Sequence, residues 1–218
     1  MDTIGILGAT GPLGRGLAAR WTRAGYTVHL GSRRQERAED ARAGLVEDGA
    51  PADRLVAGEN LEVAEAADLV VVAVPYEGQA PALPALADAV DGKIVCTAVV
   101  PLGFDSTGPY LLDVEDGSAA HECQRLLPGA RLVAGFHAVS SKRLRAVDEP
   151  VEADALLCSD DEDAMAVVAD LADVITGLRG VPVGPLRLAS QLEGQTAVVL
   201  SYNKRNRAEA GLRLVDES

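Results

Sequence analysis

The sequence has few aromatic residues, few basic residues and no long apolar run. Only 3% of its 218 residues are aromatic, so platforms that stack the bases of single-stranded nucleic acid are not expected. There are 20 Lys and Arg against 33 Asp and Glu, and the net charge of −13 argues against a nucleic-acid partner. The longest apolar stretches, residues 69–75 and 94–102, are too short to cross a bilayer. We therefore expect a protein that binds neither nucleic acid nor membrane.

The cysteines and the N-terminus indicate the compartment. Cys96, Cys123 and Cys158 are widely separated and odd in number, so they form neither a disulfide framework nor a CxxC metal pair. The N-terminal residues lack a basic segment followed by an apolar run, so no signal peptide is expected. These features predict a cytoplasmic protein without a metal site.

The first 145 residues alternate apolar runs with amphipathic stretches, which is typical of a parallel sheet covered by helices on both faces. The stretch 104–118 is rich in Gly, Asp and Ser and is expected to be a loop. The pattern predicts a Rossmann-type, doubly wound α/β fold. Strands are expected at residues 3–7, 26–30, 55–57, 69–74, 93–99 and 131–138, and helices at 13–24, 35–46, 62–67 and 119–127.

The pattern changes after residue 145. Strands are expected at 154–158 and 182–186, and helices at 161–176 and 192–210. No Pro- and Ser-rich linker separates the two parts, so the second should pack directly on the first. We expect an NADP-binding domain over residues 1–145 and a small C-terminal α/β domain over residues 146–218.

A glycine-rich turn follows the first strand and opens the first helix. In such a turn the glycines let the backbone approach a pyrophosphate, and unpaired amides at the helix N-terminus hold that anion. A tight turn without a ligand is the alternative, but the strand–turn–helix context favours a dinucleotide. The predicted phosphate-binding residues are Gly8, Ala9, Thr10, Gly11, Pro12, Leu13 and Gly14.

The end of the second strand distinguishes the two nicotinamide dinucleotides. An Asp or Glu at this place binds the ribose of NAD, whereas this chain has Ser32 followed by Arg33, Arg34 and Arg37. The alternative is that these arginines are the solvated start of a helix, where they would oppose its dipole. Guanidinium groups grip a phosphate with charge-assisted hydrogen bonds, so the sequence favours NADP.

Other candidates follow later strands. Val74, Pro75, Tyr76 and Val100 stand where two strands end and are predicted to line the path of the pyrophosphate and nicotinamide. The alternative is that the prolines only stop these strands. His137 is either a proton donor or a hydrogen-bonded scaffold residue at the mouth of the site. The acidic residues 160–163 are expected to begin a helix rather than bind a metal.

These motifs, in this order, resemble those of the F420-dependent NADP oxidoreductases of archaea and actinobacteria. The resemblance covers residues 4–14, 31–37, 75–77, 99–101, 136–139, 184–186 and 196–212. Asn206 and the polar residues 193–195 depart from the family's pattern. The resemblance implies NADP and coenzyme F420 as cofactors, a homodimer, and a site that includes Ala138 and Val139 beside His137.

The reaction implied by this resemblance is hydride transfer between C4 of the nicotinamide and C5 of the deazaflavin, which depends mainly on positioning. Two alternatives stay open: an NADPH-dependent reductase of a small carbonyl or imine, which needs a proton donor, and a non-catalytic NADP sensor. F420 carries an anionic tail, which the net charge would repel. Basic clusters at 141–145 and 204–207 are candidates to offset this repulsion, with Lys204 and Arg207 expected on one helix face.

Overall fold

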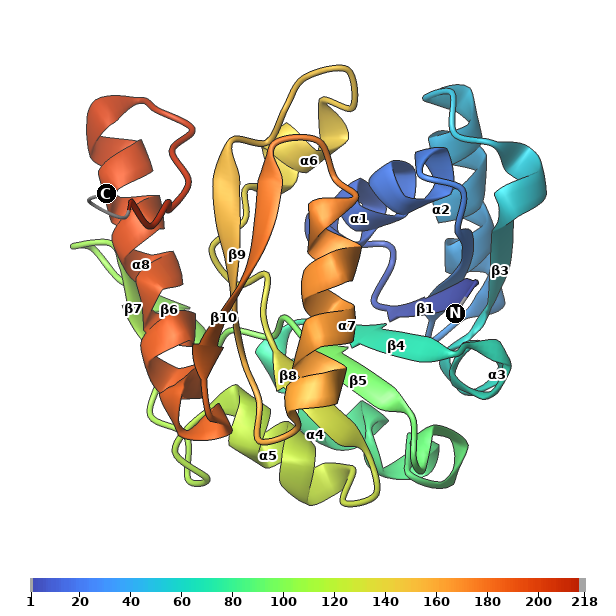
Figure 1. The fold of residues 1–218 in the computed structure, drawn as a ribbon, viewed down its shortest axis with the longest axis horizontal. Coiled ribbons are helices and arrows are strands. Elements are labelled where there is room, and N and C mark those ends of the chain that lie inside the picture. Colours follow the sequence, from blue (N-terminus) through green and yellow to red (C-terminus); the bar gives the residue numbers. More distant parts are fainter. Residues whose placement is uncertain (1, 216–218) are drawn as a thin grey trace.

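The computed structural model describes residues 2–215, which form one eight-stranded sheet with helices on both faces (Figure 1). The strands of this sheet are β1 (Thr3–Leu7), β2 (Thr27–Ser32), β3 (Leu55–Glu59), β4 (Leu69–Val72), β5 (Ile94–Thr97), β8 (Arg131–Ala134), β9 (Ala153–Cys158) and β10 (Leu178–Gly184). The helices are α1 (Pro12–Arg23), α2 (Gln35–Glu47), α3 (Asn60–Ala66), α4 (Tyr76–Ala82), α5 (Ala119–Leu126), α6 (Ser141–Arg145), α7 (Glu162–Asp173) and α8 (Ala189–Asn206).

The strand order confirms the predicted fold class. The sheet runs β10-β9-β8-β5-β4-β1-β2-β3, and the six strands from β8 to β3 are parallel, in the order of a Rossmann sheet. Strand β9 pairs antiparallel with β8, through Ala134 and Cys158, and β10 then runs parallel to β9. Strands β9 and β10 therefore extend the first sheet instead of forming a second one. A domain boundary at residue 145, the last residue of α6, stays a prediction.

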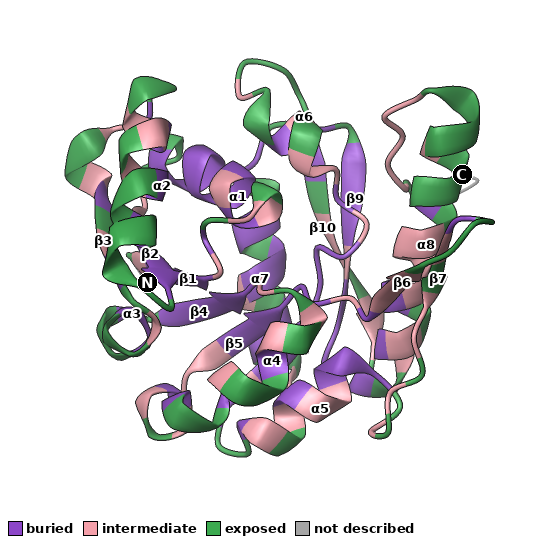
Figure 2. Cartoon of the chain, turned by 180° about the vertical axis from the view of Figure 1, so that it is seen from behind, coloured by how far each residue is buried: buried purple, intermediate pink, exposed green. Residues whose placement is uncertain are grey.

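Alternation along the central strands builds a separate core on each face of the sheet. In β1, Ile4 and Ile6 pack in the core that contains Trp21 of α1, whereas Leu7 packs in the opposite core. The first core includes α7 and the second includes α3, α5 and the first turns of α8. Figure 2 shows the resulting burial of β1 and β4 between the helices. The carboxyl ends of the parallel strands thus lie on a rigid frame.

The predicted loop at 104–118 is wrong in its first part, where two short strands form a hairpin. Strands β6 (Leu102–Phe104) and β7 (Pro109–Leu111) are antiparallel. The Asp105 carboxylate accepts hydrogen bonds from the amides of Thr107 and Gly108 at 2.7 and 3.0 Å. This turn uses the same polar residues that indicated a loop.

Several predicted boundaries are also wrong. Helix α4 was not predicted because it contains Gly78 and Pro81, and α6 because it has only five residues. The strands expected to end at residues 74, 99 and 138 end at Val72, Thr97 and Ala134, and the strand expected from residue 182 begins at Leu178. Among the helices of residues 2–215, none is both long and apolar enough to span a bilayer.

The last helix ends earlier than expected. Arg207 adopts a left-handed conformation with a φ of 50°, so α8 stops at Asn206 rather than residue 210. The expectation that Lys204 and Arg207 share one helix face is therefore wrong, because Arg207 lies outside the helix.

Arg20 connects the first helix to the segment that follows β8. Its guanidinium is buried and donates five hydrogen bonds of 2.7–3.0 Å to main-chain carbonyls between residues 143 and 149. A Cβ at Gly16 would lie 2.6 Å from the Leu144 Cβ, so only glycine lets α1 and α6 pack this closely. Arg20 and Gly16 together hold α6 against α1.

We predict that Arg20→Met lowers the free energy of unfolding by at least about 3 kcal/mol, because several charge-assisted hydrogen bonds are lost together. The measurement is urea denaturation followed by circular dichroism. The exposed Arg23→Met serves as the control and should change little. A loss below about 1 kcal/mol in Arg20→Met would contradict this role.

Candidate functional site

A cavity of about 700 Å³ opens beyond the carboxyl ends of β1, β2 and β4. We name it the Ser32 cavity. Its lining brings together the glycine turn, the arginines after β2 and the start of α4. The predicted residues that line it are Gly8, Thr10, Ser32, Arg33, Arg34, Arg37, Val74 and Pro75.

A second cavity, of about 500 Å³, opens beyond β5 and β8. We name it the His137 cavity. The predicted residues that line it are Pro12, Leu13, Val100, His137, Ala138 and Val139. Since the β1–α1 turn supplies walls to both cavities, it lies where a ligand in one meets a ligand in the other. Both volumes fall in the usual range for small-molecule sites.

The turn is held by close backbone contacts. The amides of Gly8 and Ala9 both donate to the Gly31 carbonyl at 3.1 Å. Gly8 has a φ of +79°, and a Cβ there would lie 2.8 Å from the Ala73 carbonyl oxygen, so no other residue fits. A Cβ at Gly14 would lie 2.9 Å from the Ala9 Cα. These two glycines allow the turn to pass between the ends of β2 and β4.

Four predicted residues line neither cavity. Ala9 is fully buried below the turn, and Gly14 packs the helix against it. Gly11 caps α1 and has room for a Cβ, so packing alone does not require this glycine. Tyr76 begins α4, and burial together with nearby Glu122 raises the pKa of its hydroxyl. The assignment of these four residues to cofactor binding stays a prediction.

The cationic end of the Ser32 cavity is built at the start of α2. Ser32 is the buried last residue of β2, and Arg33, Arg34 and Arg37 are exposed around it. Within residues 2–215, no carboxylate forms an ion pair with these three arginines. Three unpaired cations at a helix N-terminus form a binding site for a doubly charged anion.

Sequence reasoning missed part of this wall. Asn60 begins α3 and lines the Ser32 cavity, with its buried Oδ1 lacking a hydrogen-bond partner in the described structure. A Cβ at Gly31 would lie 2.9 Å from this oxygen. Only the pairing of β2 with β3 brings Asn60 here, so no local motif could have indicated it. Glu77, Gly78 and Ala82 of α4 complete the wall.

His137 lies in a tight turn after β8. Phe136 has a φ of 62°, rare for a bulky residue, and its ring makes an edge contact with Trp21 at 6.0 Å between centroids. The His137 carbonyl accepts a hydrogen bond of 3.0 Å from the Thr196 hydroxyl of α8. The buried side chain of Phe136 and the bond to α8 therefore fix the turn that presents His137 to the cavity.

The imidazole of His137 is neutral. It is 8% exposed, and neither ring nitrogen has a hydrogen-bond partner within residues 2–215. Burial lowers its pKa to about 4. The ring is therefore not an imidazolium acid near neutrality, and its nitrogens are available to a ligand in the cavity.

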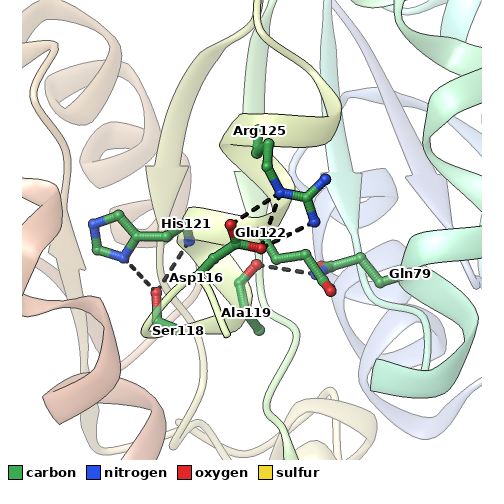
Figure 3. Close-up of polar contacts among 7 residues, drawn as sticks. All are labelled: Gln79, Asp116, Ser118, Ala119, His121, Glu122 and Arg125. Atoms are coloured by element: carbon green, nitrogen blue, oxygen red, sulfur yellow. Dashed lines mark hydrogen bonds and ion pairs between the residues drawn. The ribbon is translucent and has the colours of Figure 1, made fainter. Parts of the chain in front are cut away.

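A polar cluster at the start of α5 has the composition of a catalytic site but not its accessibility (Figure 3). The Ser118 hydroxyl lies 2.6 Å from His121 Nδ1. The same hydroxyl caps α5 by accepting from the His121 amide, and Ser118 is 1% exposed. The Arg125 side chain is turned toward Asp116, away from this pair. The cluster caps the helix and contributes no nucleophile.

Glu193, one of the polar residues where the chain departs from the family's pattern, is also structural. It is fully buried on α8, and its carboxylate accepts from the amides of Ala119 and Ala120 at 3.1 and 3.0 Å. Burial raises its pKa to about 7. Glu193 thus ties α8 to the start of α5 and lines neither cavity.

The comparison with known proteins agrees with this geometry. Residues 3–101 match the family described as NADP oxidoreductase, coenzyme F420-dependent. The chain is 37% identical to an F420-dependent NADP reductase of Methanothermobacter thermautotrophicus, over 98% of this chain and 94% of that protein. It belongs to the F420-dependent NADP reductase family.

Two further comparisons extend over the whole chain. An F420-dependent NADP reductase of Methanocaldococcus jannaschii is 34% identical over 98% of each chain. A crystal structure from Arthrobacter sp. fb24 superposes with a TM-score of 0.86 and covers 99% of this chain and 100% of its own, at 23% identity. That structure supports the fold of this F420-dependent NADP reductase family member from β1 to α8.

We predict that His137 stays unprotonated down to about pH 5, as observed by NMR titration of its imidazole protons and assigned with His137→Gln. The unfolded chain takes up this proton near pH 6.5 and the folded chain near pH 4. His137 should therefore lower the free energy of unfolding as the pH falls through this range, and His137→Gln should remove that dependence. A midpoint near 6.5 in the folded protein would show that the ring is hydrated.

Proposed function

We propose that this protein transfers hydride between NADP(H) and the deazaflavin coenzyme F420. The observation that supports this most directly is the pair of cavities that share the β1–α1 turn, one cationic and the other built around a neutral histidine. A two-ligand reaction without acid–base chemistry requires this arrangement. Membership of the F420-dependent NADP reductase family names the two ligands.

NADP fits the Ser32 cavity. Arg33, Arg34 and Arg37 would hold the 2′-phosphate with the Ser32 hydroxyl, and the unpaired Oδ1 of Asn60 would accept from the ribose. Gly8 and the first-turn amides of α1 would hold the pyrophosphate, which explains why α1 has no acidic residue in its first turn. Val74 and Pro75 would line the way to the second cavity.

The deazaflavin fits the His137 cavity. Pro12, Leu13 and Val100 present an apolar wall, and the unpartnered nitrogens of His137 supply hydrogen-bonding groups to a heterocycle. When both ligands are bound, hydride passes between C4 of the nicotinamide and C5 of the deazaflavin. The chain's contribution is to hold the rings at contact distance and exclude water.

The alternative, reduction of a small carbonyl or imine, is not favoured. That reaction needs a proton donor, and the low pKa of His137 leaves the cavity without an imidazolium near neutrality. A non-catalytic sensor would need only the Ser32 cavity and would leave the His137 cavity without a role.

The test is to mix the protein with NADPH and oxidised F420 and to follow the deazaflavin absorbance. We expect reduction of F420 at a rate proportional to enzyme concentration. Binding of NADPH without turnover of F420 would favour a sensor, and turnover of a carbonyl or imine alone would favour the other reductase.

We predict that Ser32→Ala combined with Arg33→Gln weakens NADPH binding by roughly one to two orders of magnitude, since each charge-assisted contact contributes about 1.5–3 kcal/mol. Affinity for NADH should stay nearly unchanged. Arg187→Gln, which removes an exposed arginine outside both cavities, controls for net charge. Equal weakening of both nucleotides would place these residues on the adenosine rather than on the 2′-phosphate.

We also propose a homodimer in the cytoplasm. The outer face of α8 and the β6–β7 hairpin, which lie side by side at one end of the molecule (Figure 1), expose a group of apolar side chains. They are Phe104, Tyr110, Val198, Leu200 and Tyr202. A monomer rarely exposes such a group, so a second copy is the proposed cover. Sedimentation equilibrium should give twice the chain mass, and Val198→Asp with Tyr202→Asp should halve it.

A further inference from the structure

The rim of the His137 cavity carries one ion pair, between α6 and the segment after α8. Lys142 Nζ lies 3.1 Å from Glu209 Oε1, and the Ser140 hydroxyl donates to Glu209 Oε2 at 3.3 Å. Among the described residues that line this cavity, Lys142 is the only cation and Glu209 the only carboxylate. The charge that a ligand meets at this rim is therefore decided by these two residues.

The depth of the cavity orients a ligand that has an apolar ring and a charged tail. His137, at the inner wall, is 8% exposed, whereas the side chains of Lys142 and Glu209 are 69% and 41% exposed. A heterocycle would lie against the inner wall, and a charged tail would leave past the rim, where it stays hydrated. Lys142 would attract an anionic tail, and Glu209 would repel it.

The backbone of Glu209 is held independently of the ion pair. The Asn203 side chain makes two hydrogen bonds to the Ala210 main chain, at 2.8 and 3.2 Å, and Arg143 Nε donates to the Glu209 carbonyl at 2.7 Å. Further along, the Leu212 carbonyl accepts from the Asp154 amide at 2.7 Å. The carboxylate therefore remains at the rim whether or not Lys142 is bound to it.

We propose that Glu209 is a specificity-determining residue that limits how much negative charge the tail of the deazaflavin substrate carries. This rests on the proposed function. An exposed ion pair is weak, so an incoming phosphate or carboxylate can replace Glu209 on Lys142. The displaced Glu209 carboxylate then stays near the tail, and its repulsion grows with each additional negative charge.

The test compares tailed F420 with the neutral deazaflavin that lacks the phosphodiester and glutamates. Dissociation constants are measured by quenching of deazaflavin fluorescence, and Michaelis constants with NADPH. At low salt, Glu209→Gln should bind tailed F420 at least about threefold more tightly, the effect of one nearby charge in water. Binding of the tailless compound should not change, and the gain should shrink above about 0.15 M salt.

Glu152→Gln is the matched control. Glu152 pairs with Arg213 of the same C-terminal segment at 2.7 Å, is similarly exposed, and lines neither cavity. The substitution makes the same change in net charge and should leave both deazaflavins unaffected. Lys142→Met should weaken binding of tailed F420 alone.

Three results would overturn the proposal: no change in Glu209→Gln, an equal gain for the tailless compound, or an equal gain in Glu152→Gln. If neither deazaflavin binds to the wild-type protein or accepts hydride from NADPH, the proposed function fails, and this inference fails with it. Normal turnover of both compounds with no dependence on Glu209 would overturn the inference alone.

Discussion

The close approach of three strand ends at Gly8 is the constraint on which the rest of the site depends. The turn after β1 bonds to the end of β2 through Gly31 and lies against the end of β4 at Ala73. A side chain at Gly8 would separate these strands, since its Cβ would overlap the Ala73 carbonyl. The start of α1 is thereby fixed between the two cavities. One backbone conformation thus sets where a pyrophosphate can bind and how near the two rings can lie.

The second requirement is that the elements far from this turn are brought to it and held. Arg20 and Gly16 fasten α6 to α1, which places Lys142 at the rim of the His137 cavity. Thr196 ties α8 to the His137 turn, and Glu193 ties the same helix to α5. Each tie joins residues more than 50 positions apart, so the His137 cavity is a product of the complete fold.

This division explains what could be predicted from the sequence. The Gly8 turn and the Ser32 group are local patterns whose geometry follows from a strand–turn–helix unit, and the residues that they indicated line one cavity. Asn60, Thr196 and Glu209 carry no local signal, because strand pairing and helix docking alone bring them to the site. Tyr76 shows the opposite error, since its place after a strand suggested a cavity wall, whereas α4 directs it elsewhere. The β6–β7 hairpin was missed because its turn residues are also those of loops.

The electrostatics of the molecule are local rather than global. A net charge of −13 repels anionic ligands at a distance, yet three arginines without carboxylate partners surround Ser32. The rim of the other cavity is nearly neutral, with Lys142 against Glu209. The two ligands therefore face different fields, with strong attraction for a phosphate in one cavity and weak attraction at the other.

The central claim is that the two cavities hold their ligands so close that hydride passes directly between them. The most direct measurement uses NADPH carrying deuterium at the transferred C4 position, with mass spectrometry of the reduced deazaflavin. We predict that the deuterium appears on C5 of the deazaflavin without dilution by solvent. Loss of the label to water would contradict direct transfer, and with it the role of the shared turn.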